Sequence, residues 1–143
     1  MSLSQGDFFY FVSDPTWDDP PHPKIVLLVT DRREIVYLCC TKDADYVVER
    51  CKIVEGVNAK MPYKTMVKIT PTNRPQSNSN SYINCNELSS LSERRIMSSR
   101  KYSNKGCVPN DLFGMIKVAV FNSPNTRNAI RSTLASPIKP PMV

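Results

Sequence analysis

The chain has 143 residues, of which 41% are apolar and 22% are charged, as in one soluble globular domain, and we expect residues 1–143 to form one. We find no run of about 18 uncharged apolar residues and no signal-peptide pattern at the start, so we expect a cytoplasmic protein without a membrane span. Twelve prolines against four glycines argue against long helical bundles, because proline blocks helix interiors.

The cysteines and the histidine limit the chemistry that the chain can perform. Five cysteines are spread along the sequence without a C-x-x-C pair, which favours buried free thiols over a disulfide framework or a zinc finger. The single histidine, His22, argues against a metal centre built on a histidine cluster. We therefore expect neither a metal nor another cofactor.

The net charge of +6 is concentrated in the second half of the chain. Residues 1–71 carry nine Lys and Arg against ten Asp and Glu, whereas residues 72–143 carry ten against three. Such a surface attracts a polyanion such as RNA or DNA, because neutralised phosphates release counterions. A solvated surface that aids solubility explains the same charge equally well.

Short apolar runs in the first third predict three strands. Asp7–Ser13 is aromatic and apolar and precedes a proline-rich stretch, Asp14–Pro23, which we expect to be a stiff exposed loop. Ile25–Thr30 and Ile35–Thr41 flank a polar turn at Asp31–Glu34, as in a hairpin. We expect the first three strands here.

The middle of the chain predicts two more strands separated by polar segments. Residues 43–63 carry no clear period and are interpreted as a variable insertion. Lys64–Thr70 and Ser81–Leu88 alternate in the way of half-exposed strands. The polar stretches 72–80 and 98–106 are expected to be loops.

The period changes near residue 110. Apolar residues within Asp111–Phe121 recur at helical spacing after Asn110, which predicts an amphipathic helix capped by Asn110. Ser123 as N-cap and a proline at the next position predict a second helix over 124–134, with a flexible tail at 135–143. The expected fold is mainly β (α+β): a small barrel of about five antiparallel strands with C-terminal helices at about 110–134.

Several of these segments, in this order, resemble the PemK/MazF-like toxin ribonucleases, which have an SH3-like barrel. The matching motifs cover most of the chain: Gln5–Tyr10, His22–Val29, Leu38–Thr41, Ser81–Ile83 and the helix Asp111–Phe121. The insertion after Thr41 is longer than is usual in the family, and the second helix is not part of its minimal pattern.

The resemblance implies an activity and partners. The family cleaves single-stranded RNA without a metal, acts as a homodimer and is paired with an antitoxin protein. An arginine before the proline of the second strand acts as acid or base, and here His22 occupies that place. A threonine at the end of the third strand helps to hold the phosphate, and Thr41 matches it.

The residue types support the same site without the family. Cleavage of RNA by its 2′-hydroxyl needs a base, an acid and a charge-stabilising environment for the phosphorane. Imidazole can perform either proton transfer, which makes His22 a candidate catalytic residue together with Lys24 and Thr41, and Lys42 adds a nearby cation. The simpler interpretation is that His22 is an exposed loop residue and that Thr41 and Lys42 only end a strand.

Further candidates would contact the nucleic acid away from the reacting atoms. Ser81 could line the same pocket, although serine there is more often a turn residue. Basic side chains could follow the phosphate backbone, and Tyr82 or Tyr102 could stack on bases. Those basic residues are Arg74, Arg94, Arg95, Arg100 and Lys101. Trp17 could cover a groove or could anchor its loop to the core.

Two functions remain open from the sequence. The first is a metal-independent endoribonuclease of the PemK/MazF type. The second keeps the fold without catalysis, as a binding module of phage or mobile-element origin that holds nucleic acid, an antitoxin-like peptide or another protein.

Overall fold

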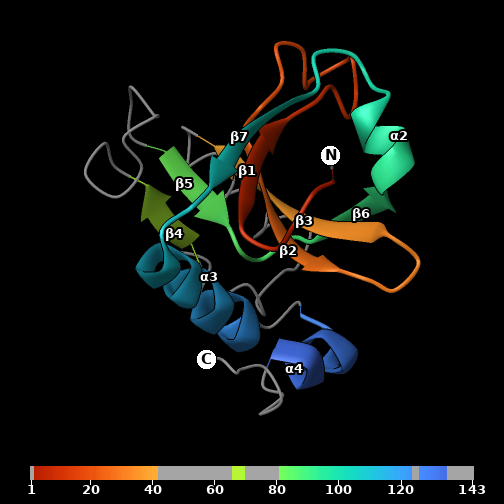
Figure 1. Ribbon diagram of the computed structural model, residues 1–143. Coiled ribbons are helices and arrows are strands. Elements are labelled where there is room, and N and C mark those ends of the chain that lie inside the picture. The colour runs from red at the N-terminus through yellow and green to blue at the C-terminus, as the bar shows by residue number, and fades with distance from the viewer. Residues whose placement is uncertain (1, 42–65, 70–80, 124–125, 135–143) are drawn as a thin grey trace.

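The chain was analysed as a computed structural model, which describes residues 2–41, 66–69, 81–123 and 126–134 (Figure 1). Within these ranges the strands are β1 (Asp7–Tyr10), β2 (Lys24–Val29), β3 (Glu34–Thr41), β4 (Met66–Ile69), β5 (Ser81–Asn84), β6 (Ser89–Ser92) and β7 (Ser103–Cys107). The helices there are α2 (Glu93–Met97), α3 (Asn110–Asn122) and α4 (Asn128–Leu134).

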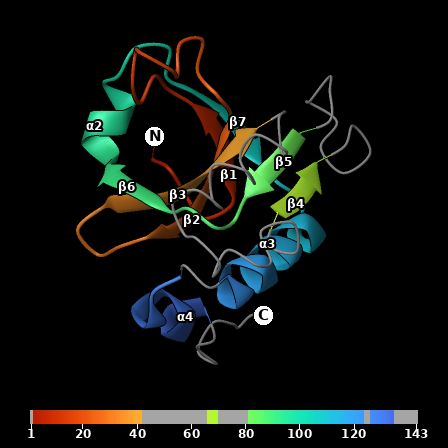
Figure 2. The same cartoon turned by 180° about the vertical axis from the view of Figure 1, so that it is seen from behind.

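The strands form one antiparallel sheet in the order β4-β5-β3-β2-β1-β7. β3 is its central strand: β2 pairs along one edge, whereas β6 and β5 pair with the first and the last part of the other. Since β5 and β6 follow one another in the chain, residues 85–88 interrupt what would otherwise be one long strand. The result is a curved sheet, as Figures 1 and 2 show from opposite sides.

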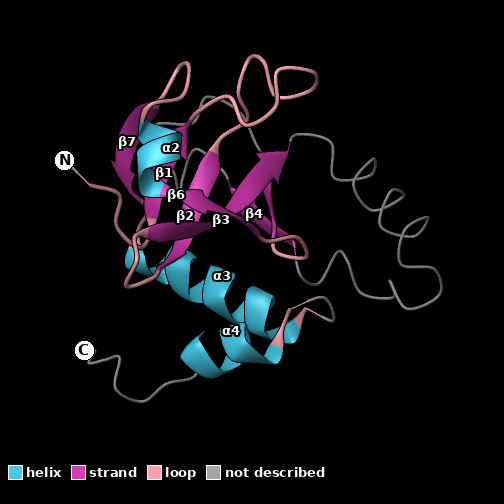
Figure 3. Cartoon of the chain, turned by 90° about the vertical axis from the view of Figure 1, so that its right-hand side faces the viewer, coloured by secondary structure: helices cyan, strands magenta, loops and turns pink. Residues whose placement is uncertain are grey.

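The curved sheet buries apolar side chains on both faces. Successive residues of a strand point to opposite faces, so Phe8 belongs to the cluster under α3 and Phe9 to a second cluster with Ile96 of α2. Figure 3 shows α3 and α4 together against one face of the sheet, away from α2. The uninterrupted apolar run of β2 follows from this arrangement, because both faces of that strand are covered.

The predicted mainly β fold with C-terminal helices is confirmed, but the expected number of about five strands is too low. The described ranges contain seven strands, and the segment expected to be one strand over Ser81–Leu88 ends at Asn84. The prediction of a loop over 98–106 is wrong, because Ser103–Cys107 pairs with β1 at the edge of the sheet. The side chains of β7 are almost wholly exposed. An edge strand without a buried face does not require apolar residues at every second position, so the sequence shows no strand pattern there.

Both helix starts differ from the expected caps. Asn110 is already helical and Pro109 holds the cap position, where its carbonyl accepts a hydrogen bond from the Phe113 amide at 3.0 Å. The second helix starts at Asn128, later than the predicted start at residue 124, and the Ser123 carbonyl accepts a hydrogen bond from the Thr126 amide at 3.2 Å. The insertion at 43–63, the loop at 72–80 and the tail at 135–143 lie outside the described residues.

A truncation to alanine is expected to destabilise the fold on the buried side of α3 and to have little effect on its exposed side. Ile116 is fully buried beneath the sheet, whereas Val118 is 61% exposed. We expect Ile116→Ala to lower the free energy of unfolding by about 2–5 kcal/mol, because it leaves a cavity. Val118→Ala is the matched control and should change it by no more than about 0.5 kcal/mol. Urea unfolding followed by circular dichroism measures both, and equal losses would contradict the packing described here.

Candidate functional site

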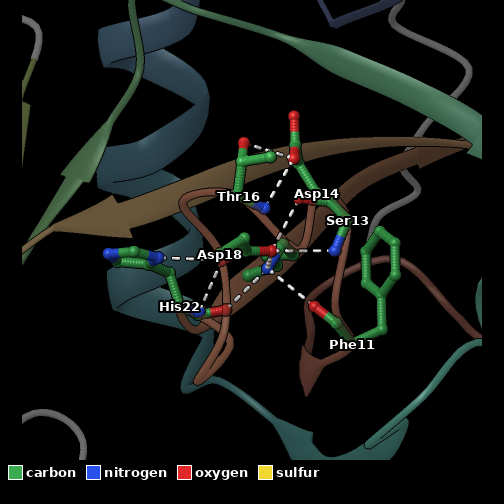
Figure 4. A network of polar contacts seen from close by, with 7 residues as sticks. Phe11, Ser13, Asp14, Thr16, Asp18 and His22 are labelled. Carbon is green, nitrogen blue, oxygen red and sulfur yellow. Dashed lines mark hydrogen bonds and ion pairs between the residues drawn. The ribbon is translucent and has the colours of Figure 1, made fainter.

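A buried aspartate organises the loop between β1 and β2. Asp18 is 0% exposed, and its Oδ2 accepts hydrogen bonds from the Ser13 amide at 2.9 Å and the Ser13 hydroxyl at 2.6 Å. Its Oδ1 accepts from the amide of His22 at 2.8 Å and contacts Nδ1 of the same residue at 2.8 Å (Figure 4). The loop that the sequence predicts to be exposed is therefore fastened from inside by one carboxylate.

Lys24 lies beneath this loop instead of facing solvent. Its side chain is 0% exposed, and Nζ donates to Asp18 Oδ2 at 2.7 Å, to the His22 carbonyl at 2.8 Å and to the Phe11 carbonyl at 3.1 Å. An ammonium has three N–H donors, so these contacts use all of them. Nζ also lies 4.9 Å from the centre of the Phe11 ring. In this arrangement Lys24 supports Asp18 and His22 and does not reach an outer phosphate.

The same contacts fix the ionisation of Asp18. Burial raises the pKa of this carboxyl, but hydrogen bonds from the His22 amide, Lys24 and Ser13 outweigh burial and lower the pKa to about 2. Asp18 is thus ionised at neutral pH and can only accept hydrogen bonds. The contact with Nδ1 of His22 therefore requires Nδ1 to carry a proton.

That proton assignment defines what His22 can do. A neutral imidazole protonated at Nδ1 keeps Nε2 as its acceptor. The His22 side chain is 41% exposed, and Figure 4 shows its other ring nitrogen pointing away from Asp18. A ring held in one tautomer and one orientation, with an outward acceptor, has the geometry of a general base.

Strand register places Thr41 at the same end of the sheet. Lys24 is paired with Cys39, and the Cys40 amide donates to the Pro23 carbonyl at 2.9 Å. If this antiparallel register continued by one more step, Thr41 would lie opposite His22. The predicted hairpin thus returns the end of β3 to the start of β2, as the sequence-based site requires.

The row of paired positions continues across two further strands. Thr41 is paired with Tyr82 of β5, and Tyr82 with Lys68 of β4. Directly opposed residues share a face, and this face is opposite to the one on which Cys40 and Ile83 pack under α3. Lys68 is exposed, with Nζ 5.8 Å from the centre of the Tyr82 ring. A hydroxyl, an aromatic ring and a cation therefore follow His22 along one face.

The other predicted basic residues have different surroundings. Arg100 and Lys101 form ion pairs with Asp19 of the His22 loop, at 3.1 and 2.8 Å. These partners, Lys101 first, lower the pKa of the Asp19 carboxyl. Arg94 and Arg95 are exposed on α2. Ser81 begins β5, whereas Lys42 and Arg74 lie outside the described residues.

The cysteines give no support to a thiol nucleophile at this site. Cys40 and Cys85 are buried in the cluster under α3, and burial raises the pKa of both thiols, that of Cys85 to about 12. Cys39 is half-buried on the opposite face. The cysteines in the described residues are free, in line with the expectation of buried free thiols for Cys40 and Cys85, while Cys107 is exposed.

Sequence reasoning missed Asp18 and Asp19, which it treated as part of a polar loop. One signal was available: Asp18 stands only four residues before His22 and six before Lys24, so the three are close in the sequence. A lysine that opens an apolar strand also requires an acidic partner if it is buried.

Replacing Asp18 should change the response of the protein to acid. The ionised carboxyl contributes about 2 kcal/mol to the free energy of unfolding. This contribution is complete at pH values above the ordinary pKa of 3.8 and is lost as the pH falls toward the pKa of about 2 in the folded protein. Asp18→Asn should remove that pH dependence. It should also lower stability at pH 7 by about 3–5 kcal/mol, since Lys24 is left buried without a counter-charge. Denaturant unfolding from pH 7 to pH 2 measures both effects.

The matched control for this prediction is Asp31→Asn, a change in the exposed turn between β2 and β3. It should leave the free energy of unfolding at pH 7 within about 0.5 kcal/mol of the wild type. An Asp18→Asn protein as stable as the control at pH 7 would contradict the assigned pairing.

The fold is similar to that of solved MazE–MazF structures. A chain in the form-II crystal structure of MazE–MazF from Deinococcus radiodurans aligns with a TM-score of 0.54 and 12% identity, over 84% of this chain and 92% of that chain. The form-III structure gives a TM-score of 0.52 and 11% identity, over 84% and 93%. No protein-family model and no curated protein matches the sequence. Within the described residues, no helix has the length and apolar character to cross a membrane. The chain thus has a PemK/MazF-like fold.

Proposed function

We propose that this protein is a metal-independent endoribonuclease of the PemK/MazF type that cleaves single-stranded RNA by attack of a 2′-hydroxyl. The observation that carries the proposal is the hydrogen bond between His22 Nδ1 and the buried Asp18 carboxylate, at 2.8 Å, which leaves Nε2 as the outward acceptor. The likeness to MazE–MazF structures supports the same activity through the fold.

In the proposed reaction the 2′-oxygen forms a bond to phosphorus while the bond to the 5′-oxygen breaks. His22 Nε2 takes the proton of the 2′-hydroxyl, and the resulting imidazolium is stabilised by Asp18. The leaving 5′-oxygen takes a proton from the imidazolium or from water. Thr41 donates a hydrogen bond to a phosphate oxygen as charge develops there. The products are a 2′,3′-cyclic phosphate and a 5′-hydroxyl.

Lys24 has a different role from the one its sequence position suggests. Buried and fully hydrogen-bonded, it holds Asp18 ionised, so in our proposal it is a positioning residue and does not touch the phosphate. The proposed RNA contacts are Thr41 and Ser81 at the strand ends and the basic residues Lys42, Arg74, Arg94, Arg95, Arg100 and Lys101. Lys68 and Tyr82 extend this set across β4 and β5.

The partners follow from the likeness alone. The similar structures are MazE–MazF structures. We extend that to this chain as a proposal of an antitoxin-like protein partner, a homodimer and a cytoplasmic site of action.

The second candidate function keeps the fold and omits catalysis. The observation that favours it is the burial of Lys24, which removes from the open surface one of the cations that a phosphorane would need. In that case the face that carries Thr41, Tyr82 and Lys68 would bind single-stranded nucleic acid without cleaving it.

His22→Ala separates the two candidates. If His22 transfers a proton in the rate-limiting step, cleavage of a long single-stranded RNA in EDTA should fall by about 10²-fold or more. Affinity for a 2′-O-methyl oligonucleotide, which lacks the attacking hydroxyl, should stay the same. Val118→Ala, on the far side of α3, is the control. Cleavage by His22→Ala at the wild-type rate, or products without a cyclic phosphate, would contradict the assigned base.

Salt dependence tests the proposed phosphate contacts. Each contact that is neutralised should reduce the slope of log affinity against log salt by about 1. We expect this for Arg94→Gln and Arg95→Gln, measured by fluorescence anisotropy with a labelled 2′-O-methyl oligonucleotide. Lys117→Gln on α3 removes the same charge from the other face and should leave the slope unchanged. If neither these changes nor His22→Ala alters any RNA measurement, a protein partner becomes the better explanation of this face.

A further inference from the structure

Trp17 is the only tryptophan of the chain, and its side chain is 56% exposed in the loop that carries His22. The loop could have anchored this ring in the core, as the sequence left open, but the structure leaves most of it in solvent. An indole ring that stays in water does not contribute the free energy of folding that its burial would provide. The exposure therefore needs a reason outside the folding of the loop.

The backbone that carries the exposed ring is held in place. The Trp17 amide donates to the Asp14 carbonyl at 3.3 Å, and the next amide, that of Asp18, donates to the same carbonyl at 2.7 Å. Hydrogen bonds from Thr16 and from the Trp17 side chain lower the pKa of the Asp14 carboxyl. With its backbone fixed by these bonds and its ring against that of His22, the indole has a restricted position before a ligand meets it.

The indole is also a neighbour of the proposed base. The centres of the Trp17 and His22 rings are 5.7 Å apart, and the ring planes are inclined by 43°. The two rings do not stack in parallel, so His22 does not cover the face of the indole. In a nucleotide, the 2′-hydroxyl and the base are attached to neighbouring carbons of the same ribose. If the 2′-hydroxyl contacts His22 Nε2, the base therefore lies close enough to contact Trp17.

The charged residues at this loop do not account for the binding of a base. Asp18 is paired with Lys24, and Asp19 with Arg100 and Lys101. Lys24 is buried in its pair, whereas the exposed Arg100 and Lys101 can still contact a phosphate but offer no surface for a base. An aromatic face, by contrast, binds any base, because every base has a π-face.

From these contacts we infer that Trp17 is a stacking platform for the nucleobase that flanks the scissile phosphate. This inference rests on the proposed binding of single-stranded RNA and adds a residue that selects for an unpaired base at that position. A paired base is already stacked within its duplex, so a fixed indole at the reacting nucleotide favours single strands.

Tryptophan fluorescence tests the inference directly, since the chain has one tryptophan and excitation at a wavelength that its six tyrosines do not absorb reports on that residue alone. The wild-type protein is titrated with a 2′-O-methyl octanucleotide and with an octamer of the same phosphate count that is abasic at its central positions. We expect quenching and a shift of the Trp17 emission with the first and neither change with the second. Equal quenching by both would overturn the inference, as would no change with the first at saturating binding.

Substitution gives the second measurement. Trp17→Ala should weaken binding of the 2′-O-methyl octamer by about 10- to 100-fold and raise KM for cleavage, with the salt slope unchanged, because stacking releases no counterions. Trp17→Phe should recover most of the affinity. Phe121→Ala, which removes a 42% exposed ring from α3, is the matched control and should have no effect.

The results separate this inference from the proposed function. Quenching without cleavage of unmodified RNA would keep the stacking role and refute the ribonuclease. Cleavage with an unchanged KM in Trp17→Ala would keep the ribonuclease and refute the stacking role. A lower salt slope in Trp17→Ala would also refute it, because a loop that had lost its shape would lose phosphate contacts.

Discussion

The pairing of Asp18 with Lys24 determines the arrangement of the candidate site. A buried charge is costly unless it is paired and hydrogen-bonded, and here the carboxylate and the ammonium satisfy one another together with the Ser13 and His22 backbone. The pair closes the proline-rich loop onto the start of β2. That closure brings His22 to Asp18 and leaves Trp17 on the outside of the loop. One electrostatic contact inside the protein thus sets both the orientation of the imidazole and the exposure of the indole.

Most of the fold could be predicted from local pattern, and the part that could not has a physical reason. Apolar runs located β1, β2 and β3, because a strand covered on both faces must be apolar throughout. β7 was missed because its stability comes from backbone pairing with β1, and its side chains stay in solvent. Asn110 and Ser123 were plausible caps by residue type, but cap positions depend on where the preceding chain leaves the sheet.

The site was predictable only where it follows from strand pairing. The pairing of the end of β3 with the start of β2 could be predicted because a hairpin returns the chain to its start. The burial of Lys24 could not be predicted, because a lysine beside a loop is ordinarily exposed to water. Its burial depends on Asp18, and nothing in the sequence distinguishes Asp18 from the other acidic residues of the loop. Resemblance identified the position of His22, while the structure identified the carboxylate that orients it.

The pairing of β3 with β5 and of β5 with β4 has a consequence for variation in chain length. Thr41 lies two strands away from Lys68, about 10 Å, and Ile69 is directly paired with Ser81. The segments 42–65 and 70–80 therefore begin and end at points that the sheet fixes, whatever their length. The entropic cost of joining two fixed ends grows only with the logarithm of the length of the connection, by about 0.6 kcal/mol for each doubling. A change in chain length between these fixed ends is therefore expected to cost little stability, so contacts can be added next to the face that carries Tyr82 while the paired strands stay the same.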